Sequence, residues 1–196
     1  MNQTISYYDE HAEEYCAATV NADMSFCRDR FMTYLPARAH ILDAGCGSGR
    51  DSKVFLEKGF TVTAIDASEG MCKESEKLLG QDVIQCTFQE MNFQNEFDGI
   101  WACASLLHVT RSDIDLVLQN LKKALKYEGV LYLSFKYGNE ERMMKERFFN
   151  DYNENLLSVV LENNGFTVMD IFTTEDVRKN RSGEMWVNAF AKKLHE

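Results

Sequence analysis

Short apolar runs alternate along this chain with longer stretches in which apolar residues recur at helical spacing. Consecutive apolar residues are typical of strands buried on both faces, and the helical spacing is typical of amphipathic helices. This alternation predicts a parallel sheet with helices on both faces. We place its strands at a run that begins with Ile41 and at residues 61–66, 83–86, 97–102 and 130–136.

Capping residues mark the expected helix ends. Residues 5–19 and 25–34 are predicted to form two helices before the first strand, and residues 50–58 a third one after it. Ser68 is predicted to cap a helix that stops at Gly80, because a hydroxyl accepts from first-turn N–H groups and glycine favours helix ends. The same signals place two later helices between Ser112 and Gly129, and between Asp151, with Glu154 at capping-box spacing, and Gly165.

The last third of the chain changes character. Residues 137–150 are polar and charged, and no element is predicted there. Residues 167–173 and 185–192 have the pattern of two strands without an intervening helix, which predicts a hairpin and therefore one antiparallel strand. We find no repeat, linker or low-complexity segment. The prediction is a single domain over residues 1–196, with residues 1–36 as a helical segment within it.

Composition narrows the class of protein. The chain has 196 residues, 45% of them apolar, and no apolar run long enough to span a membrane. The six cysteines form no C-x-x-C pair, which disfavours zinc and redox motifs and favours buried thiols in a reducing cytoplasm. No signal-peptide pattern is present, so we expect a cytoplasmic protein without a membrane segment. The net charge of −10 disfavours nonspecific nucleic-acid binding.

A glycine-rich turn follows the first predicted strand. The sequence Ile-Leu-Asp-Ala-Gly-Cys-Gly-Ser-Gly-Arg-Asp spans residues 41–51 and places Gly45, Gly47 and Gly49 at alternating positions. Glycine accepts positive φ and lets a ligand approach the backbone, and the following helix offers unpaired N–H groups. A tight turn without a ligand is the alternative. The spacing differs from the dinucleotide fingerprint G-x-G-x-x-G, which favours a ligand without a pyrophosphate.

The segment Asp43-Ala44-Gly45-Cys46-Gly47-Ser48-Gly49 resembles the first motif of class I S-adenosylmethionine (SAM) dependent methyltransferases. With residues 59–66, it is most similar to small soluble members, such as the tellurite-resistance and thiopurine-like groups or the type 11/12 methyltransferase domains. The resemblance implies a Rossmann-like seven-stranded, mostly parallel sheet with one antiparallel strand. It also implies SAM as cofactor and S-adenosylhomocysteine as product. The segment around Tyr7, Tyr8 and Tyr15 resembles the N-terminal lid of such enzymes.

The resemblance also implies roles for cofactor-binding residues. The carbonyl groups of Gly45 and Ala102 would receive the SAM ammonium group, and Asp43 would support the turn or contact that end. Asp66, at the end of the second strand, would accept from both ribose hydroxyls. Asp51 is either a charge partner or an ordinary helix-start acid. The remaining expected contacts are Cys46, Gly47 and Gly49 in the turn and Ala67, Met71, Phe88 and Gln89 around the adenine, where Met71 could instead be a core residue.

Two classes of methyltransferase are excluded by proline content. The only proline is Pro36, so the chain lacks the proline-containing N-P-P-Y or D-P-P-Y motif of DNA and protein amide methyltransferases and the Pro-Cys nucleophile of cytosine C5 enzymes. His108, after the fourth strand, is the candidate general base, unless it only packs there. Tyr7 is the second candidate catalytic residue. Tyr137, Arg147 and Trp186 are expected around the acceptor, and Arg142, Arg147, Arg178 and Arg181 indicate an anionic substrate or merely solvated loops.

The function predicted from these residues is methyl transfer from SAM to a small-molecule acceptor. A tRNA-modifying methyltransferase and a SAM-binding partner or regulatory subunit without activity are the alternatives. No metal site is expected, because ligating residues are not clustered. We expect no membrane association and a monomer or homodimer.

Overall fold

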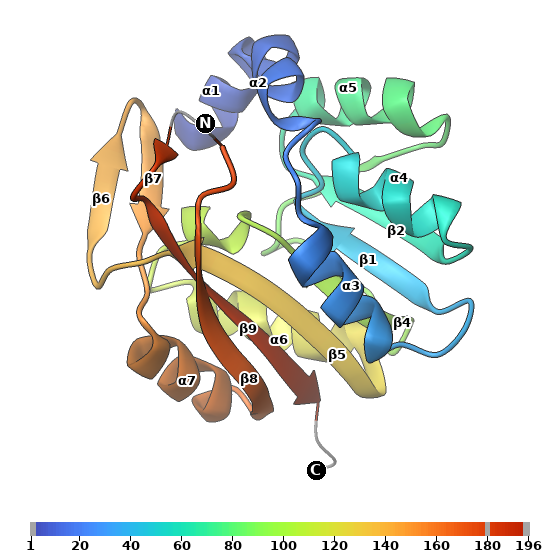
Figure 1. The fold of residues 1–196 in the computed structure, drawn as a ribbon, viewed down its shortest axis with the longest axis vertical. Helices are drawn as coiled ribbons and strands as arrows, with labels where there is room; N and C mark the ends of the chain where they lie inside the picture. Colours follow the sequence, from blue (N-terminus) through green and yellow to red (C-terminus); the bar gives the residue numbers. More distant parts are fainter. Residues whose placement is uncertain (1–2, 179–180, 194–196) are drawn as a thin grey trace.

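The structure, a computed structural model, describes residues 3–178 and 181–193. Its centre is a seven-stranded sheet with the order β3-β2-β1-β4-β5-β9-β8 (Figure 1). Strand β9 runs antiparallel to both of its neighbours, whereas the other adjacent pairs are parallel. The predicted fold class, with one reversed strand, is therefore confirmed. The strands are β1 His40–Ala44, β2 Thr61–Asp66, β3 Ile84–Gln85, β4 Phe97–Ala102, β5 Leu125–Lys136, β8 Phe166–Glu175 and β9 Met185–Lys193.

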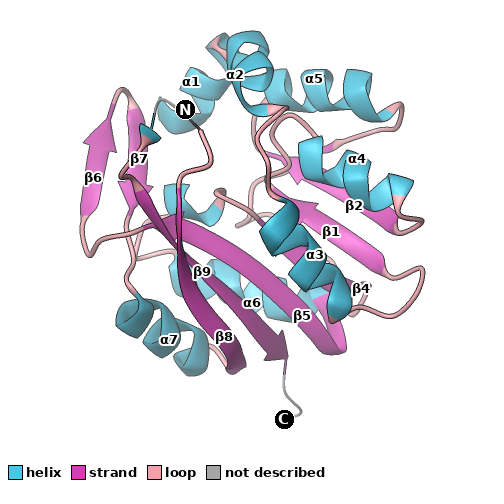
Figure 2. Cartoon of the chain, viewed as in Figure 1, coloured by secondary structure: helices cyan, strands magenta, loops and turns pink. Residues whose placement is uncertain are grey.

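Helices cover both faces of this sheet (Figure 2). On one face lie α3 Ser25–Thr33, α4 Arg50–Glu57 and α5 Glu69–Leu79, and on the other α6 Ile114–Ala124 and α7 Glu154–Asn163. Neighbouring residues of a strand serve opposite faces, because strand side chains alternate. Ile41 packs with Phe31 and Phe55 on the first face, whereas Leu42 packs with the cluster under α6 and α7. The central strands are therefore apolar at consecutive positions, as the sequence pattern indicated.

Several predicted boundaries agree with the structure. Strands β2 and β4 have the predicted limits, and α5 ends with Gly80 at φ +66°. The Ser68 hydroxyl accepts from the Met71 backbone N–H at the start of α5, as a capping serine should. These boundaries depend on contacts within a few residues, which a sequence pattern reports directly.

The N-terminal segment forms two helices where one was predicted over residues 5–19. Helix α1 spans Gln3–Glu10 and α2 spans Ala12–Thr19. His11 lies between them at φ −117° and ψ 17°, and its Nδ1 lies 2.9 Å from the Tyr7 carbonyl oxygen. The ring thus contacts a carbonyl group near the end of α1. The break lets α1 contact both α5 and the segment near residue 148 while α2 contacts α5.

Helix α6 differs from the prediction at both ends. Its N-cap is Asp113, and Ser112 is not the cap: the Thr110 carbonyl accepts from both Asp113 and Ile114. The helix ends at Ala124, five residues before Gly129, because Leu125 already pairs with Phe97 and starts β5. Gly129 lies inside this strand. A Cβ there would lie 2.9 Å from the Leu125 Cδ2, so glycine is required by packing.

The cap of α7 was also wrongly assigned. Asn153 accepts from the Leu156 backbone N–H, whereas the Asp151 carboxylate pairs with Arg142.

Residues 137–150, left without an element in the sequence analysis, contain the hairpin of β6 Glu141–Met144 and β7 Arg147–Asn150. Its turn places Lys145 and Glu146 at positive φ (47° and 63°). Hairpin turns of this kind usually carry asparagine or glycine, so Lys145 and Glu146 are not recognisable as a turn.

The structure bears on the expected free thiols and on the expected lack of a membrane-spanning segment. All six cysteines are free; Cys86 and Cys103 are partly exposed and the others are buried. Among the described residues, none of the helices has the length and apolar character needed to cross a membrane.

Candidate cofactor and acceptor site

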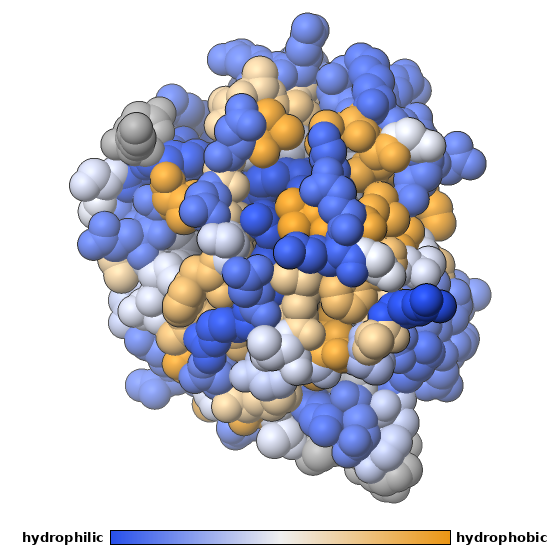
Figure 3. Space-filling model, turned by 45° about the vertical axis from the view of Figure 1, so that its right-hand side comes forward, coloured by the Kyte–Doolittle hydropathy of each residue, from blue (hydrophilic) through white to orange (hydrophobic). Residues whose placement is uncertain are grey.

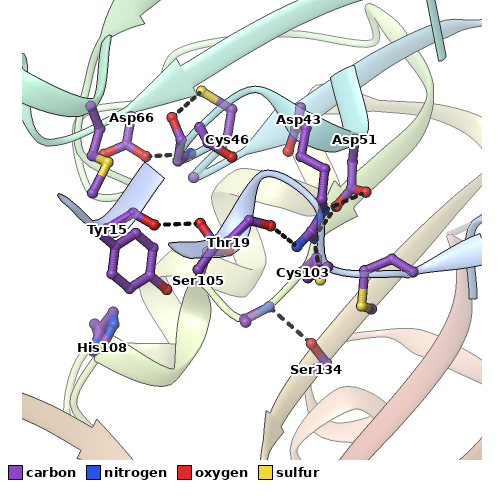
Figure 4. Close-up of a pocket in the computed structure, with 18 of the residues that line it drawn as sticks. Tyr15, Thr19, Asp43, Cys46, Asp51, Asp66, Cys103, Ser105, His108 and Ser134 are labelled. Atoms are coloured by element: carbon purple, nitrogen blue, oxygen red, sulfur yellow. Dashed lines mark hydrogen bonds and ion pairs between the residues drawn. The ribbon is translucent and has the colours of Figure 1, made fainter. Parts of the chain in front are cut away.

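A cavity lies at the carboxyl ends of β1, β2 and β4, beneath α1 and α2 (Figure 4). Its walls are the glycine turn after β1, the start of α5, residues 87–89, residues 103–109 and the ends of β8 and β9. Parallel strands bring their carboxyl ends to one edge, which is where open α/β sheets bind ligands. Figure 3 shows one face of the molecule, on which apolar side chains lie in groups among polar ones. Phe26 lines the cavity and is 60% exposed.

Each glycine of the turn has a different role. All three have positive φ, at +80° for Gly45, +54° for Gly47 and +76° for Gly49. A Cβ on Gly45 would lie 2.5 Å from the Ser105 Cβ, and one on Gly49 would lie 2.5 Å from the Ser75 hydroxyl oxygen. A Cβ on Gly47 would meet no atom within 4 Å. Packing therefore requires Gly45 and Gly49, whereas Gly47 leaves open space in the cavity wall.

The carboxylate of Asp66 ties the end of β2 to this turn. Its Oδ2 accepts from the Gly47 backbone N–H at 2.9 Å, and its Oδ1 accepts from the Ser68 N–H at 3.0 Å. Burial raises the pKa of Asp66, and the backbone donors oppose that rise. Each carboxylate oxygen keeps a further lone pair. Asp66 can therefore accept from hydroxyl groups of a ligand while it supports the turn.

Asp43 is buried behind the turn, with 3% of its surface exposed. Its Oδ2 accepts from the Ser52 hydroxyl at 2.7 Å. Burial, reinforced by the charge of Asp51, raises the pKa of Asp43 to about 7. The carboxyl group faces the cavity. A bound cation would favour its ionised form, because an opposite charge lowers the pKa of a carboxyl group.

Asp51 is held by cations of the chain itself. Its carboxylate accepts from Arg28 at 2.7 Å, from Arg50 at 2.6 Å and from the Trp101 indole N–H at 3.0 Å. Although burial opposes it, Arg50 and Arg28 lower the pKa of Asp51. The two arginines outnumber the one acid, so this group carries net positive charge. Asp51 therefore positions Arg50 in the cavity wall.

Arg50 is a site residue that the sequence analysis missed. Its guanidinium also contacts the Thr19 carbonyl oxygen at 3.4 Å and the Cys103 sulfur at 3.9 Å, as Figure 4 shows. It lines the cavity, as Asp66 does. Its position directly after Gly49, in the first turn of α4, was the feature of the sequence that could have indicated a place in the site.

His108 ends the short helix η1 Leu106–His108 and lines the cavity. Its Nδ1 lies 2.6 Å from the Phe148 carbonyl oxygen, and its Nε2 lies 2.9 Å from the Tyr8 hydroxyl. Because a carbonyl oxygen can only accept, Nδ1 carries the proton and Nε2 accepts from Tyr8. Burial lowers the pKa of His108 to about 4. The ring is therefore neutral near pH 7, and its lone pair is engaged by Tyr8.

Tyr8, rather than the predicted Tyr7, reaches the cavity. The Tyr7 ring stacks on His11, with ring centroids 4.4 Å apart, and lies 4.8 Å from the Arg147 guanidinium carbon. The Tyr8 hydroxyl contacts both His108 and Arg147. Neighbouring helical residues point about 100° apart, so only one of the two tyrosines can face the cavity.

The far wall contains paired charges. Lys136 lies 3.0 Å from the Asp176 carboxylate and 4.2 Å from the Trp186 ring centroid, and Arg178 pairs with Asp176 at 2.6 Å. Trp186 lines the cavity, as expected, whereas Tyr137 is 46% exposed and lies outside it. Arg181 pairs with Glu184. Of these charged groups, Asp176 and Arg178 line the cavity, and they pair with each other.

Among residues 3–178 and 181–193, no cluster of three or more histidine, cysteine or acidic side chains could hold a metal ion.

Comparison with known proteins supports the interpretation of residues 43–49 as a methyltransferase motif. Residues 41–129 match a family model described as a methyltransferase domain. This part of the chain, which includes the glycine turn, is therefore similar to methyltransferase domains. It is 35% identical over 104 residues to the Bacillus subtilis protein YqeM, which has a provisional methyltransferase name, covering 50% of this chain and 42% of that protein. It is also 35% identical over 108 residues to the malonyl-[acyl-carrier protein] O-methyltransferase of Enterobacter lignolyticus, covering 53% and 42%. The chain thus spans less than half the length of these relatives.

Solved structures share the fold of this chain. The 1,6-didemethyltoxoflavin-N1-methyltransferase of Burkholderia thailandensis, crystallised with 1,6-didemethyltoxoflavin and S-adenosylhomocysteine, matches with a TM-score of 0.79 and 24% identity, over 97% of this chain and 85% of that one. The [4+2]-cyclase SpnF matches with a TM-score of 0.76 and 15% identity, over 100% of this chain and 97% of that one. A cyclase with this architecture shows that the fold does not by itself determine the reaction.

Most of the predicted site residues meet at this cavity. Its lining includes Asp43, Gly45, Cys46, Gly47, Asp51, Asp66, Ala67, Met71, Phe88, Gln89 and His108. Gly49 is used in packing, and Ala102 is fully buried in β4, just before the residues that reach the cavity. Met71 has both of its suggested roles, since it lines the cavity and packs with Ala12 and Cys16.

Proposed function

We propose that this domain binds SAM in the cavity and transfers its methyl group to a small-molecule acceptor, within one domain over residues 1–196 whose first 36 residues act as a lid. The observation that carries this proposal is the open space at Gly47 beside the Asp66 carboxylate. A ligand backbone can pass over Gly47, and hydroxyl groups can reach Asp66. Both features fit a nucleoside joined to an amino-acid chain.

The residues around the turn fit the remaining parts of SAM. Asp43 and the Gly45 carbonyl would receive the ammonium group, and Arg50 would pair with the carboxylate. Asp66 would accept from the ribose hydroxyls, because charge-assisted hydrogen bonds are stronger than neutral ones. Met71 and Phe88 would contact the adenine, with Ala67 and Gln89 at its edge. These contacts together match each polar group of the cofactor with a partner of opposite character.

The chemistry demanded of the protein is modest. Bound SAM supplies a methyl group already activated by a positively charged sulfur. The chain therefore has to position the acceptor and exclude water. Helices α1 and α2 cover the cavity, and Tyr8 and His108 lie on its acceptor side. A small acceptor fits such a covered site better than an extended polymer does.

A small-molecule acceptor is also supported by the relatives. The Burkholderia structure holds a small heteroaromatic compound, and several curated relatives are named O-methyltransferases. The net charge of −10 disfavours the tRNA alternative. A cytoplasmic location and a monomeric or homodimeric state are further proposals, as is the alternative of a SAM-binding subunit without activity.

Two measurements test this function. Calorimetry in the presence of a chelator should show binding of SAM and S-adenosylhomocysteine without metal. Incubation of the protein and labelled SAM with a metabolite extract should then transfer label to a compound of low molecular mass. Cofactor binding without any transfer, together with a stable complex with a second protein, would instead support the regulatory subunit.

A further inference from the structure

Arg147, on β7, is a buried cation without a counter-charge among residues 3–178 and 181–193. Only 7% of its surface is exposed, its Nη1 donates to the Tyr8 hydroxyl at 3.3 Å, and its Nε is buried without any partner. None of the ion pairs among the described residues includes it. Buried arginines are normally paired, since an isolated charge is costly to remove from water. The described part of the chain therefore provides no negative partner for this arginine.

Arg142 shows what ordinary pairing looks like in the same hairpin. Its guanidinium carbon lies 5.2 Å from the Phe149 ring centroid, and that of Arg147 lies 5.3 Å from the same centroid. Arg142, however, bonds the Asp151 carboxylate at 2.5 Å. The other arginines near the cavity, Arg50 and Arg178, pair with Asp51 and Asp176. Arg147 is thus distinguished by the missing acid.

The groups that face Arg147 are neutral or aromatic. Tyr7 and Tyr8 approach it from α1, and His108 lies on the other side of the Tyr8 hydroxyl. His108 donates to the Phe148 carbonyl group, so it supplies no negative charge. Tyr8 lines the cavity and its hydroxyl accepts from Arg147, so it connects the arginine to the cavity. Its hydroxyl proton can turn from His108 toward a bound acceptor while Arg147 still donates to the oxygen.

We propose that the acceptor half of the cavity binds a small aromatic anion, whose charged oxygen or nitrogen accepts from the Tyr8 hydroxyl and is stabilised by Arg147 behind it. This rests on the proposed function. Tyr15, Phe26 and Trp186 also line the cavity and suit a planar ring. The acceptor would lose its proton to solvent before binding. Its lone pair would form the bond to the methyl carbon as the carbon–sulfur bond breaks with its electron pair on sulfur. The negative charge of the acceptor and the positive charge on sulfur disappear together.

Three nitro-substituted probes of similar size test this inference on the S-adenosylhomocysteine complex of the full chain. They are 4-nitrophenol, measured at mildly alkaline pH where it is ionised, 4-nitrobenzoate, and the neutral 4-nitroanisole. We expect at least one anion to bind about ten- to a hundredfold more tightly than 4-nitroanisole, the range of a charge-assisted hydrogen bond. Preference for 4-nitrophenol indicates a phenolate-type acceptor, and preference for 4-nitrobenzoate indicates a carboxylate.

The variants Arg147→Met and Tyr8→Phe should lose this preference, while Arg142→Met, the matched control, should keep it. Tyr8→Phe retains the ring, so it tests the hydroxyl even where Arg147→Met disturbs the contact with α1. Equal or tighter binding of 4-nitroanisole by the wild type, no binding of either anion, or an unchanged preference in Tyr8→Phe would overturn the inference. S-adenosylhomocysteine affinity is measured first for each protein. Its absence in the wild type would refute the proposed function, whereas normal cofactor binding without anion preference refutes only the acceptor class.

Discussion

The carboxylate of Asp66 accepts a hydrogen bond from the backbone N–H of Gly47, and this 2.9 Å contact joins the end of β2 to the turn after β1. Two positions 19 residues apart in the chain thereby form one wall of the cavity. The acid supports the turn with part of its hydrogen-bonding capacity and keeps the rest for a ligand. A change at either residue should therefore affect cofactor binding, but for different reasons.

The first prediction concerns the open space at Gly47. Gly47→Val should abolish measurable SAM binding, because a branched side chain would enter the cavity and resist positive φ. Gly59→Val is the matched control, since Gly59 also has positive φ, at +86°, and open space around its Cβ position, but lies outside the cavity. Calorimetry and circular dichroism compare the two. Equal cofactor affinities in two folded variants would remove Gly47 from the site.

The second prediction separates the two roles of Asp66. Asp66→Ala should weaken S-adenosylhomocysteine by about ten- to a thousandfold, given that charge-assisted hydrogen bonds contribute roughly 1.5–3 kcal/mol each. Asp66→Asn should also be impaired, because its NH₂ group would face one of two backbone N–H donors. An analogue that lacks both ribose hydroxyls is the control. The Asp66→Ala change should cost this analogue less affinity than it costs the natural ligand; an identical cost would mean that Asp66 acts only through the turn.

The third prediction assigns Arg50 to the carboxylate end of the cofactor. Arg50→Met should weaken S-adenosylhomocysteine by about tenfold or more, through loss of a charge-assisted hydrogen bond. The affinity for 5′-methylthioadenosine, which lacks the amino-acid end, should change little. Both affinities can be measured by calorimetry on the same preparations. A parallel loss for the two ligands would show that Arg50 supports the fold through Asp51 instead.

The fourth prediction is a pH dependence of stability caused by His108. Its folded-state pKa of about 4 lies below its ordinary value, so protons bind preferentially to the unfolded chain. The resulting stabilisation is complete above about pH 6.5 and declines as the pH falls toward 4, by roughly 1–3 kcal/mol in total. Urea unfolding of wild type and His108→Gln should show this difference in slope. Parallel stability curves over that interval would contradict it.

The fifth prediction concerns His108, the candidate general base of the sequence analysis. A neutral imidazole that already accepts from Tyr8 can act as a base only after that contact changes. His108→Ala should lower turnover more than SAM affinity, by up to about 10²-fold, through loss of the Tyr8 orientation. Kinetics with the acceptor found in the labelled-SAM experiment would measure this. An unaltered rate would show that His108 only packs against the Phe149 ring and bonds the Phe148 carbonyl group.

The sequence by itself determined the sheet and the cofactor half of the cavity. Buried parallel strands need consecutive apolar residues, and the turn needs glycine at positive φ, so β1, β2, β4 and Gly47 left local signals. Parallel strands also bring their carboxyl ends to one edge, which is why Asp43 and Asp66 could be placed together. These features depend on neighbours a few residues apart.

Only the tertiary structure determined which residues form the acceptor half of the cavity, the part around Tyr8 and His108. Tyr8, His108 and Arg147 come from α1, η1 and β7, and their contact spans up to 139 residues of chain. The β6–β7 hairpin that carries Arg147 has a turn of Lys145 and Glu146, residues without a turn preference, so it left no signal. Whether an arginine is paired depends on which acids fold next to it. Arg142 pairs with Asp151, whereas Arg147 has no acid partner in the described part of the chain. Long-range packing creates this difference, and no local pattern of residues records it.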